Sequence, residues 1–237
     1  MDGGLMPASA FIQHRGSGPN PRRQEGPHAH CATFSPDGRF LLVADLGVDR
    51  VFVYRVDPVH GELAPNDPPW VELPPGSGPR HVAFAPDGRR VFVVNELACT
   101  LASFAWDGEA GRLEPLDSQS TLPAGFTGRN TCAEVAVHPN GRFVYASNRG
   151  HDSLAVFAIG PEGRLRLVDH TPTGGRTPRH FALDPEGRWL WAANQDSGNI
   201  VLFRVDPKTG RLQPAGRSLS VPRPVCVLFA PVEATAE

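Results

Sequence analysis

The sequence predicts an all-β protein made of one repeated unit, and a recurring turn with fixed spacing around it carries this prediction. The turn has the pattern Pro-(Asp/Asn/Glu)-Gly-Arg and begins at Pro36, Pro86, Pro139 and Pro185. An Asp or Asn follows each proline at nine residues, and an aromatic residue follows it at eighteen. A unit that recurs every 46 to 53 residues with constant internal spacing is a supersecondary structure copied in tandem.

Each unit contains the pattern of four short strands. In the second unit, 81–85 is an apolar run that ends at the turn, and 90–95 is rich in β-branched and aromatic residues. Residues 100–106 alternate apolar with small or polar side chains, and a turn at 107–111 leads into a fourth extended segment. Four strands per ~40–50 residues are typical of a propeller blade. We therefore predict a β-propeller of four-stranded antiparallel blades.

The blades are expected at about 28–79, 80–130, 131–178 and 179–222, with single strands at about 7–14 and 224–230. These single strands have no partners for a further blade within the chain. The sequence therefore predicts one partial domain over 1–237, an incomplete arc of four blades plus two orphan strands that forms the C-terminal part of a larger ring. Its open blade edges would allow self-association with another copy.

Composition narrows the classes of function. A net charge of −2 gives no reason to expect nucleic acid or membrane as a partner. The four cysteines form no Cys-x-x-Cys pair, which argues against a zinc site. The chain starts without a basic and apolar leader, and no apolar run approaches 18 residues, so we expect a cytoplasmic protein.

The repeat also locates candidate functional residues, because variable side chains stand out at equivalent positions. The Pro-Asp-Gly turns are expected on one face of the ring, and the remaining loops on the other. Three variable positions open on that second face. Six residues before each proline stand His30, Arg80, Ala133 and Arg179; five before it stand Cys31, His81, Glu134 and His180; ten after it stand Leu46, Glu96, Arg149 and Gln195. The convergence of Arg80, Arg149, Arg179, Glu96 and His30 predicts a polyanion-binding pocket with an acid/base pair.

Structural roles are the alternative for several of these residues. The Asp45/Asn95/Asn148/Asn194 position is expected to cap the turn between the second and third strands. The Pro-Arg-His motif at Arg80 and Arg179 would also suit ion pairing between blades. His28 and His30, one residue apart, could suggest a metal, but no third ligand is spaced to complete a site. We expect neither a metal nor a cofactor.

Several ordered motifs resemble the lactonase family of seven-bladed propellers, which includes propeller-type 6-phosphogluconolactonases and the fungal carboxymuconate cyclase. The matching segments are 13–24, 27–30, 44–49, 78–81, 95–97, 147–153, 178–181 and 193–195. The resemblance covers essentially the whole chain and implies a seven-bladed ring. It places the His, two Arg and Glu of the family's proposed site on His30, Arg80, Arg149 and Glu96.

The resemblance implies a metal-free lactone hydrolase whose first candidate substrate is 6-phosphogluconolactone. Arg80 and Arg149, with Arg179, would bind phosphate or carboxylate. His30 or Glu96 would activate water, and Arg149 would stabilise the oxyanion. The predicted substrate-binding set is completed by His81, Gln195 and His28. Two alternatives remain: a lactonising cyclase of the carboxymuconate type, and a non-catalytic interaction propeller or inactive fragment.

Overall fold

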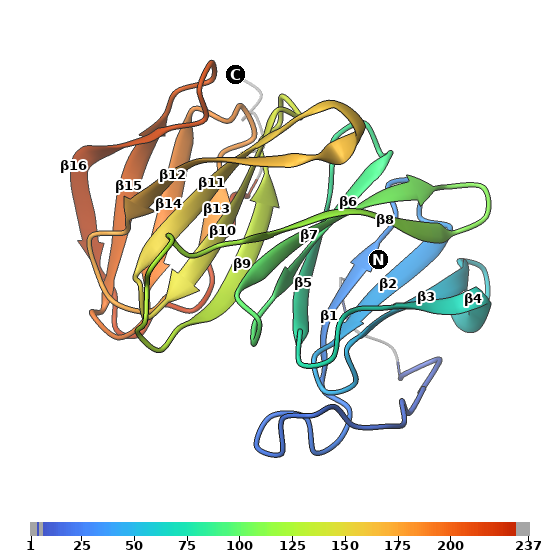
Figure 1. Cartoon of the computed structure of the whole chain (residues 1–237). Coiled ribbons are helices and arrows are strands. Elements are labelled where there is room, and N and C mark those ends of the chain that lie inside the picture. The colour runs from blue at the N-terminus through green and yellow to red at the C-terminus, as the bar shows by residue number, and fades with distance from the viewer. Residues whose placement is uncertain (1–3, 5–6, 231–237) are drawn as a thin grey trace.

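The computed structural model describes residue 4 and residues 7–230, and it contains sixteen strands in four separate sheets (Figure 1). The first blade comprises β1 (Ala29–Phe34), β2 (Phe40–Asp45), β3 (Arg50–Asp57) and β4 (Glu62–Glu72). The second comprises β5 (Pro79–Phe84), β6 (Arg90–Asn95), β7 (Thr100–Asp107) and β8 (Arg112–Ser120). The third comprises β9 (Thr131–Val137), β10 (Phe143–Arg149), β11 (Ser153–Ile159) and β12 (Leu165–Pro172), with the short 3₁₀ helix η1 (Pro161–Gly163) before β12. The fourth comprises β13 (Pro178–Leu183), β14 (Trp189–Asn194), β15 (Asn199–Val205) and β16 (Leu212–Ser220).

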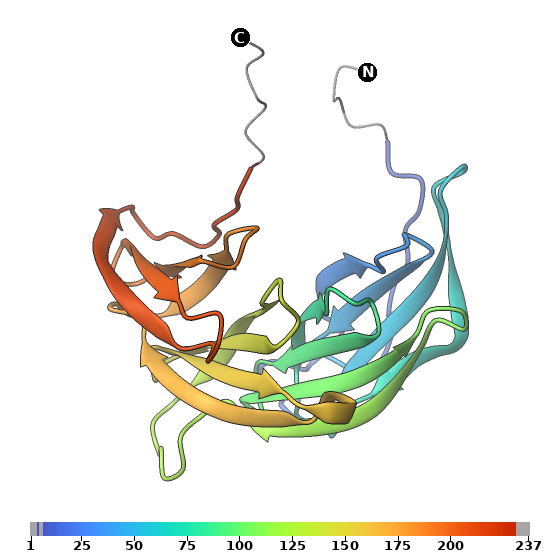
Figure 2. The same ribbon diagram turned by 90° about the horizontal axis from the view of Figure 1, so that it is seen from above.

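Every blade is an antiparallel meander whose strands pair in chain order. The four blades stand side by side around a common centre, so that the chain forms an open arc with both ends on its open side (Figure 2). The first strands β1, β5, β9 and β13 contact one another along the inside of the arc. The predicted all-β architecture of four-stranded blades is confirmed.

The repeated turns follow from backbone geometry. The turn glycines Gly38, Gly88, Gly141 and Gly187 all have φ between +66° and +72°, a region that favours glycine. The preceding Asp or Asn accepts a hydrogen bond from the arginine that follows, as when Arg39 N donates to Asp37 Oδ1 at 3.1 Å. The conserved spacing within each repeat is therefore a structural requirement of this turn.

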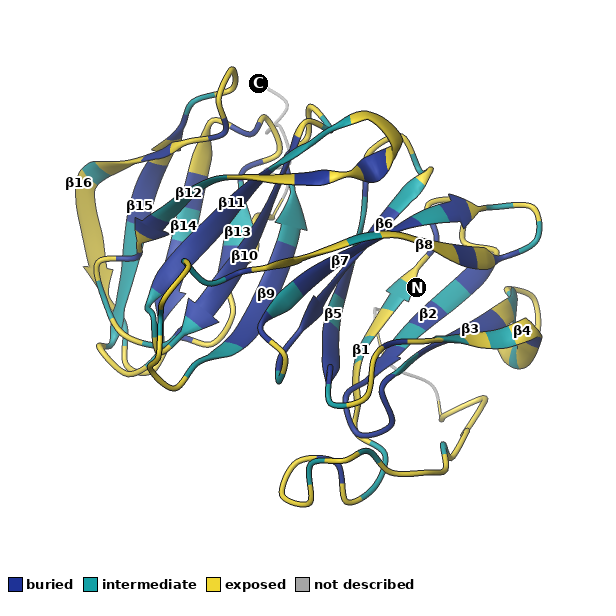
Figure 3. Cartoon of the chain, viewed as in Figure 1, coloured by how far each residue is buried: buried dark blue, intermediate teal, exposed yellow. Residues whose placement is uncertain are grey.

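Apolar side chains fill the spaces between adjacent blades. One core cluster lies between the first and second blades, a second between the second and third, and a third between the third and fourth. Phe92 and Phe157, from neighbouring blades, are fully buried in the second cluster. Burial is concentrated in the middle strands, while the outermost strands β4 and β16 are largely exposed (Figure 3). Face-to-face packing of the blades thus fixes the positions of the inner strands relative to each other.

The single strands predicted at 7–14 and 224–230 are not formed. A β-strand needs a neighbouring edge for its backbone hydrogen bonds, and these segments make side-chain contacts instead. His14 stacks on Phe52 with ring centroids 3.8 Å apart and hydrogen bonds to Asp45 at 2.6 Å and to Tyr54 at 2.7 Å. At the other end, Val227 N donates to His180 Nδ1 at 3.3 Å. Among the described residues, no helix is long and apolar enough to cross a membrane.

Candidate functional site

The inner strands carry two of the variable positions that the sequence singled out, and in all four blades the inner strand has a β-bulge there, which in the third blade falls at Ala133 and Glu134. The pairing of β1 with β2 shifts register around His30, that of β5 with β6 around Arg80, and that of β13 with β14 around Arg179. A bulge leaves one residue out of the ladder and redirects its side chain. The bulges therefore lie where the side chains differ from blade to blade.

Glu96, in the loop after β6, is the centre of the site. Its Oε2 lies 2.9 Å from Arg80 Nε and 2.9 Å from Arg149 Nη2, and its Oε1 lies 2.6 Å from Arg23 Nη1. Burial alone would raise the pKa of Glu96, but the three guanidinium groups outweigh it and the pKa is lowered. Glu96 is therefore an ionised anchor for three arginines.

The two inner arginines are held by main-chain carbonyls as well as by Glu96. Arg80 Nη1 donates to Ala133 O at 2.7 Å, and Arg149 Nη2 donates to Cys132 O at 2.7 Å. Burial, reinforced by the positive charge of Arg149, lowers the pKa of Arg80 to about 10, so Arg80 stays charged at neutral pH. The buried Nε of Arg149 has no hydrogen-bond partner among the described residues. A buried donor without an acceptor costs free energy, which the other contacts of Arg149 must offset.

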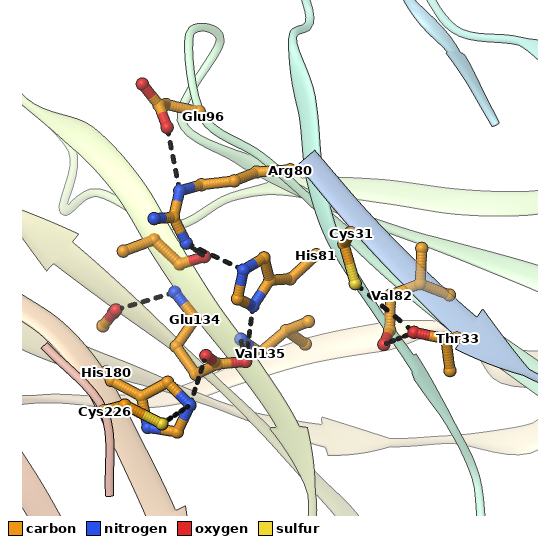
Figure 4. A network of polar contacts seen from close by, with 12 residues as sticks. Cys31, Thr33, Arg80, His81, Val82, Glu96, Glu134, Val135, His180 and Cys226 are labelled. Atoms are coloured by element: carbon orange, nitrogen blue, oxygen red, sulfur yellow. Dashed lines mark hydrogen bonds and ion pairs between the residues drawn. The ribbon is translucent and has the colours of Figure 1, made fainter. Parts of the chain in front are cut away.

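A second carboxylate, Glu134 on β9, lies between two histidines of the adjacent blades (Figure 4). His81 Nδ1 lies 2.9 Å from Glu134 Oε1, and His180 Nε2 lies 3.0 Å from Glu134 Oε2. The other nitrogen of each ring faces a donor, Arg80 Nη1 at 3.2 Å from His81 and Val227 N at 3.3 Å from His180. The ring nitrogens that face these donors accept from them, and His81 Nδ1 hydrogen bonds to Glu134 Oε1. The contact of His180 with Glu134 Oε2 lacks hydrogen-bond geometry, so this buried oxygen has no hydrogen-bond partner among the described residues.

His30 differs from these two histidines because neither of its nitrogens has a hydrogen-bond partner among the described residues. Its ring lies against that of His81, with the centroids 5.1 Å apart, and its side chain is exposed. Partial desolvation and then the positive charge of Arg80 lower the pKa of His30 to about 4. His30 is therefore a neutral imidazole with free nitrogens at neutral pH, which is the form that a general base requires.

Of the remaining predicted residues, Arg179 and Gln195 contact each other near the site, whereas His28 lies apart from it. Arg179 Nη1 lies 3.4 Å from Gln195 Oε1, and Arg179 has no carboxylate partner among the described residues. The charge of Arg179 reaches both His30 and Arg80, since it lowers the pKa of each. His28 is exposed and pairs with Glu25 at 3.1 Å, and it takes no part in these contacts.

Two charged residues of the site were absent from the predicted set. Glu134 was visible at a variable position, but only its contacts with His81 and His180 give it a place in the network. Arg23 precedes the first blade, where the repeat provides no equivalent position for comparison. Its sequence signal was its position next to Gln24 within the family-like stretch 13–24.

These residues together form what we call the central cluster. It comprises Arg23, His30, Arg80, His81, Glu96, Glu134, Arg149, Arg179 and His180. Its four guanidinium groups face only two carboxylates, so two guanidinium charges are not neutralised by carboxylates of the cluster. No three His, Cys, Asp or Glu side chains of the described chain are grouped to hold a metal ion. The arrangement is suited to binding a dianion beside a free imidazole.

Comparison with known proteins agrees with this picture. The family described as "Lactonase, 7-bladed beta-propeller" matches residues 1–229. The chain is 38% identical over 230 residues to the 6-phosphogluconolactonase of Bacillus subtilis, covering 96% of this chain and 64% of that protein. The chain thus spans just under two thirds of the length of this relative.

Solved structures give the same result. The periplasmic gluconolactonase of Pseudomonas aeruginosa superposes with a TM-score of 0.91 at 39% identity, over 98% of this chain and 64% of that one. A putative 6-phosphogluconolactonase from Bacteroides fragilis superposes with a TM-score of 0.90 at 33% identity, over 97% of this chain and 65% of that one. With the family matched along nearly its whole length, the chain belongs to the lactonase family of seven-bladed β-propellers.

Proposed function

We propose that this protein hydrolyses a phosphorylated sugar-acid lactone of the 6-phosphogluconolactone class, without a metal ion. The observation that carries the proposal is the excess of guanidinium groups beside a neutral imidazole with free nitrogens. The relatives named 6-phosphogluconolactonase support it. A phosphorylated substrate of central metabolism would place the reaction in the cytoplasm, although the Pseudomonas relative is periplasmic.

In the proposed mechanism, His30 removes a proton from water as the oxygen attacks the lactone carbonyl carbon. The carbonyl oxygen becomes an oxyanion, which the positive charge of the Arg149 guanidinium stabilises. When the tetrahedral intermediate collapses, the ring C–O bond breaks and the protonated His30 returns the proton to the leaving oxygen. The product is the open hydroxy acid, and the net reaction consumes one water.

Two features of the cluster suit this sequence of steps. The anionic substrate offsets the arginine charges that lower the pKa of His30, so binding raises that pKa toward the range useful for a general base. Glu96 has both oxygens occupied by guanidinium groups and a lowered pKa, which makes it a weak base. Its proposed role is to hold Arg80 and Arg149 in position.

Lactone hydrolysis by two variants tests this division of roles. His30→Gln should lower kcat at least ~100-fold, the usual contribution of a general base. Glu96→Gln should mainly raise KM, because two buried guanidiniums lose their common partner. His60→Gln, an exposed histidine at the β3–β4 turn that pairs with Asp57, is the control and should match the unmodified chain. If His30→Gln is as active as His60→Gln, His30 is not the base.

A further inference from the structure

Arg23 reaches the central cluster from a segment that belongs to no blade. Residues 16–26, here called the Arg23 segment, are the dark-blue loops at the lower edge of Figure 1, beside the loops that join β2 to β3 and β4 to β5. These loops belong to the face on which Glu96 lies. The Arg23 segment therefore adds a guanidinium to the site from outside the repeated architecture.

A buried amide fixes this segment in place. Gln24 is fully buried, and its Nε2 donates to Leu46 O at 2.9 Å and to Asp49 Oδ1 at 2.8 Å. Its Oε1 accepts from Asn20 N at 3.1 Å. With its polar groups satisfied inside the protein, Gln24 sets the path of the adjacent backbone. Arg23 is thus presented to Glu96 by a rigid neighbour.

Among the three arginines on Glu96, Arg23 is the one that can exchange partners. Its side chain is 45% exposed, whereas those of Arg80 and Arg149 are 3% and 13% exposed. An exposed ion pair contributes little and separates readily, while a buried charge that loses its partner is costly. Arg23 alone occupies Oε1, and the other two share Oε2. If Arg23 turned toward a ligand, Glu96 would remain neutralised by two guanidiniums.

We infer that Arg23 is a specificity-determining residue that binds the phosphate group of the substrate and selects phosphorylated over unphosphorylated lactones. This inference rests on the proposed function. A phosphate carries nearly two negative charges and three acceptor oxygens, which matches the two unneutralised positive charges of the cluster. The planar fork of arginine suits phosphate oxygens. The positive charge of Arg149 remains available for the lactone carbonyl at the other end of the molecule.

Equilibrium binding to the whole 237-residue chain tests the inference without depending on turnover. The probes are 6-phosphogluconate and gluconate, measured by isothermal titration calorimetry. Arg23→Gln should weaken phosphogluconate binding at least ~10-fold, the effect of losing one charge-assisted contact, and should change gluconate binding less than about twofold. Arg23→Lys should fall between the two, because it keeps the charge but loses the fork.

The neighbouring Arg22 provides the matched control. Arg22 is exposed, and its main-chain N–H donates to Asn20 Oδ1 at 3.1 Å, while its side chain makes no hydrogen bond or ion pair with any residue that the structure describes. Arg22→Gln removes the same charge from the same segment and should leave both affinities unchanged. Equal weakening of both ligands by Arg23→Gln, no weakening, or binding of neither probe by the unmodified chain would each overturn the inference. Hydrolysis is assayed separately, so a chain that binds phosphogluconate but hydrolyses no lactone refutes the proposed function alone.

Discussion

The lowered pKa of His30 is due first to partial desolvation and then to its charged neighbours. The guanidiniums of Arg80 and Arg179 oppose a further positive charge, and Glu96 only partly compensates. In the unfolded chain the imidazole would regain its ordinary pKa near 6.5. Protonation therefore favours the unfolded state, and the contribution of His30 to stability is lost as the pH falls from about 6.5 toward about 4.

The pH dependence of hydrolysis follows from the same shift. If neutral His30 is the base, kcat/KM reports its pKa in the free protein and should stay level from neutral pH down to about 5, with a midpoint near 4 on the acid side. An ordinary histidine would lose half the activity near pH 6.5. Initial rates measured between pH 3.5 and 8 in buffers of constant ionic strength distinguish the two. A midpoint near 6.5 would exclude His30 in the described environment.

At the scale of elements, the inner-strand bulges and the Arg23 segment decide which side chains meet. The bulges direct His30, Arg80 and Arg179 out of their ladders. The Arg23 segment depends on a close approach to the β2–β3 turn, where a Cβ added to Gly47 would collide with Gly26 O and lie 2.8 Å from His28 N. Glycine is thus required at position 47 because no side chain fits there, not because the backbone adopts an unusual angle.

Gly47→Ala should therefore displace the Arg23 segment. Because the atoms it would strike belong to the backbone, we expect a loss of about 1–3 kcal/mol in unfolding free energy, together with weaker phosphogluconate binding. Gly26→Ala is the matched control, since a Cβ there meets nothing within 4 Å. Urea denaturation followed by tryptophan fluorescence measures both variants. Equal unfolding free energies of the Gly47→Ala and Gly26→Ala variants would show that the backbone moves away from the new Cβ at Gly47 without loss of stability.

At the scale of the whole molecule, Glu134 connects three blades. It lies on β9 of the third blade and contacts His81 of the second and His180 of the fourth. Glu134→Gln replaces one acceptor oxygen by a donor, so one imidazole N–H loses its acceptor unless that ring changes tautomer. We expect a loss of about 1–3 kcal/mol in unfolding free energy and altered ¹⁵N shifts of one histidine ring. Glu114→Gln, at an exposed position on β8, should leave the unfolding free energy and the ¹⁵N shifts unchanged. If Glu134→Gln also changes neither quantity, Glu134 does not couple the blades.

Much of this architecture follows from the sequence because the repeat encodes it locally. The turn at Pro86 and the aromatic Phe104 mark the second blade without reference to any distant residue. The same register identified His30, Arg80, Glu96 and Arg149, which the structure brings to one cluster.

Contacts between different blades, and contacts with residues outside the blades, could not be predicted in this way. Arg23 precedes the first blade, so its position depends on the buried Gln24 and its partners from the β2–β3 loop. The role of Glu134 required knowing how far apart the inner strands of three blades lie. The segments 7–14 and 224–230 have strand-like composition but no edge to pair with, and composition alone does not reveal a missing neighbour.

Each blade consists of four strands that are consecutive in the sequence, and this arrangement affects how the chain folds. Hairpin neighbours are close in sequence, so loop closure costs little entropy and such pairings form early. During synthesis from the N-terminus, each blade can pair its strands as soon as its fourth strand leaves the ribosome. The apolar face of that blade remains exposed until the next blade packs against it. A delay in synthesis at that stage would leave surfaces such as the one around Phe92 open to aggregation.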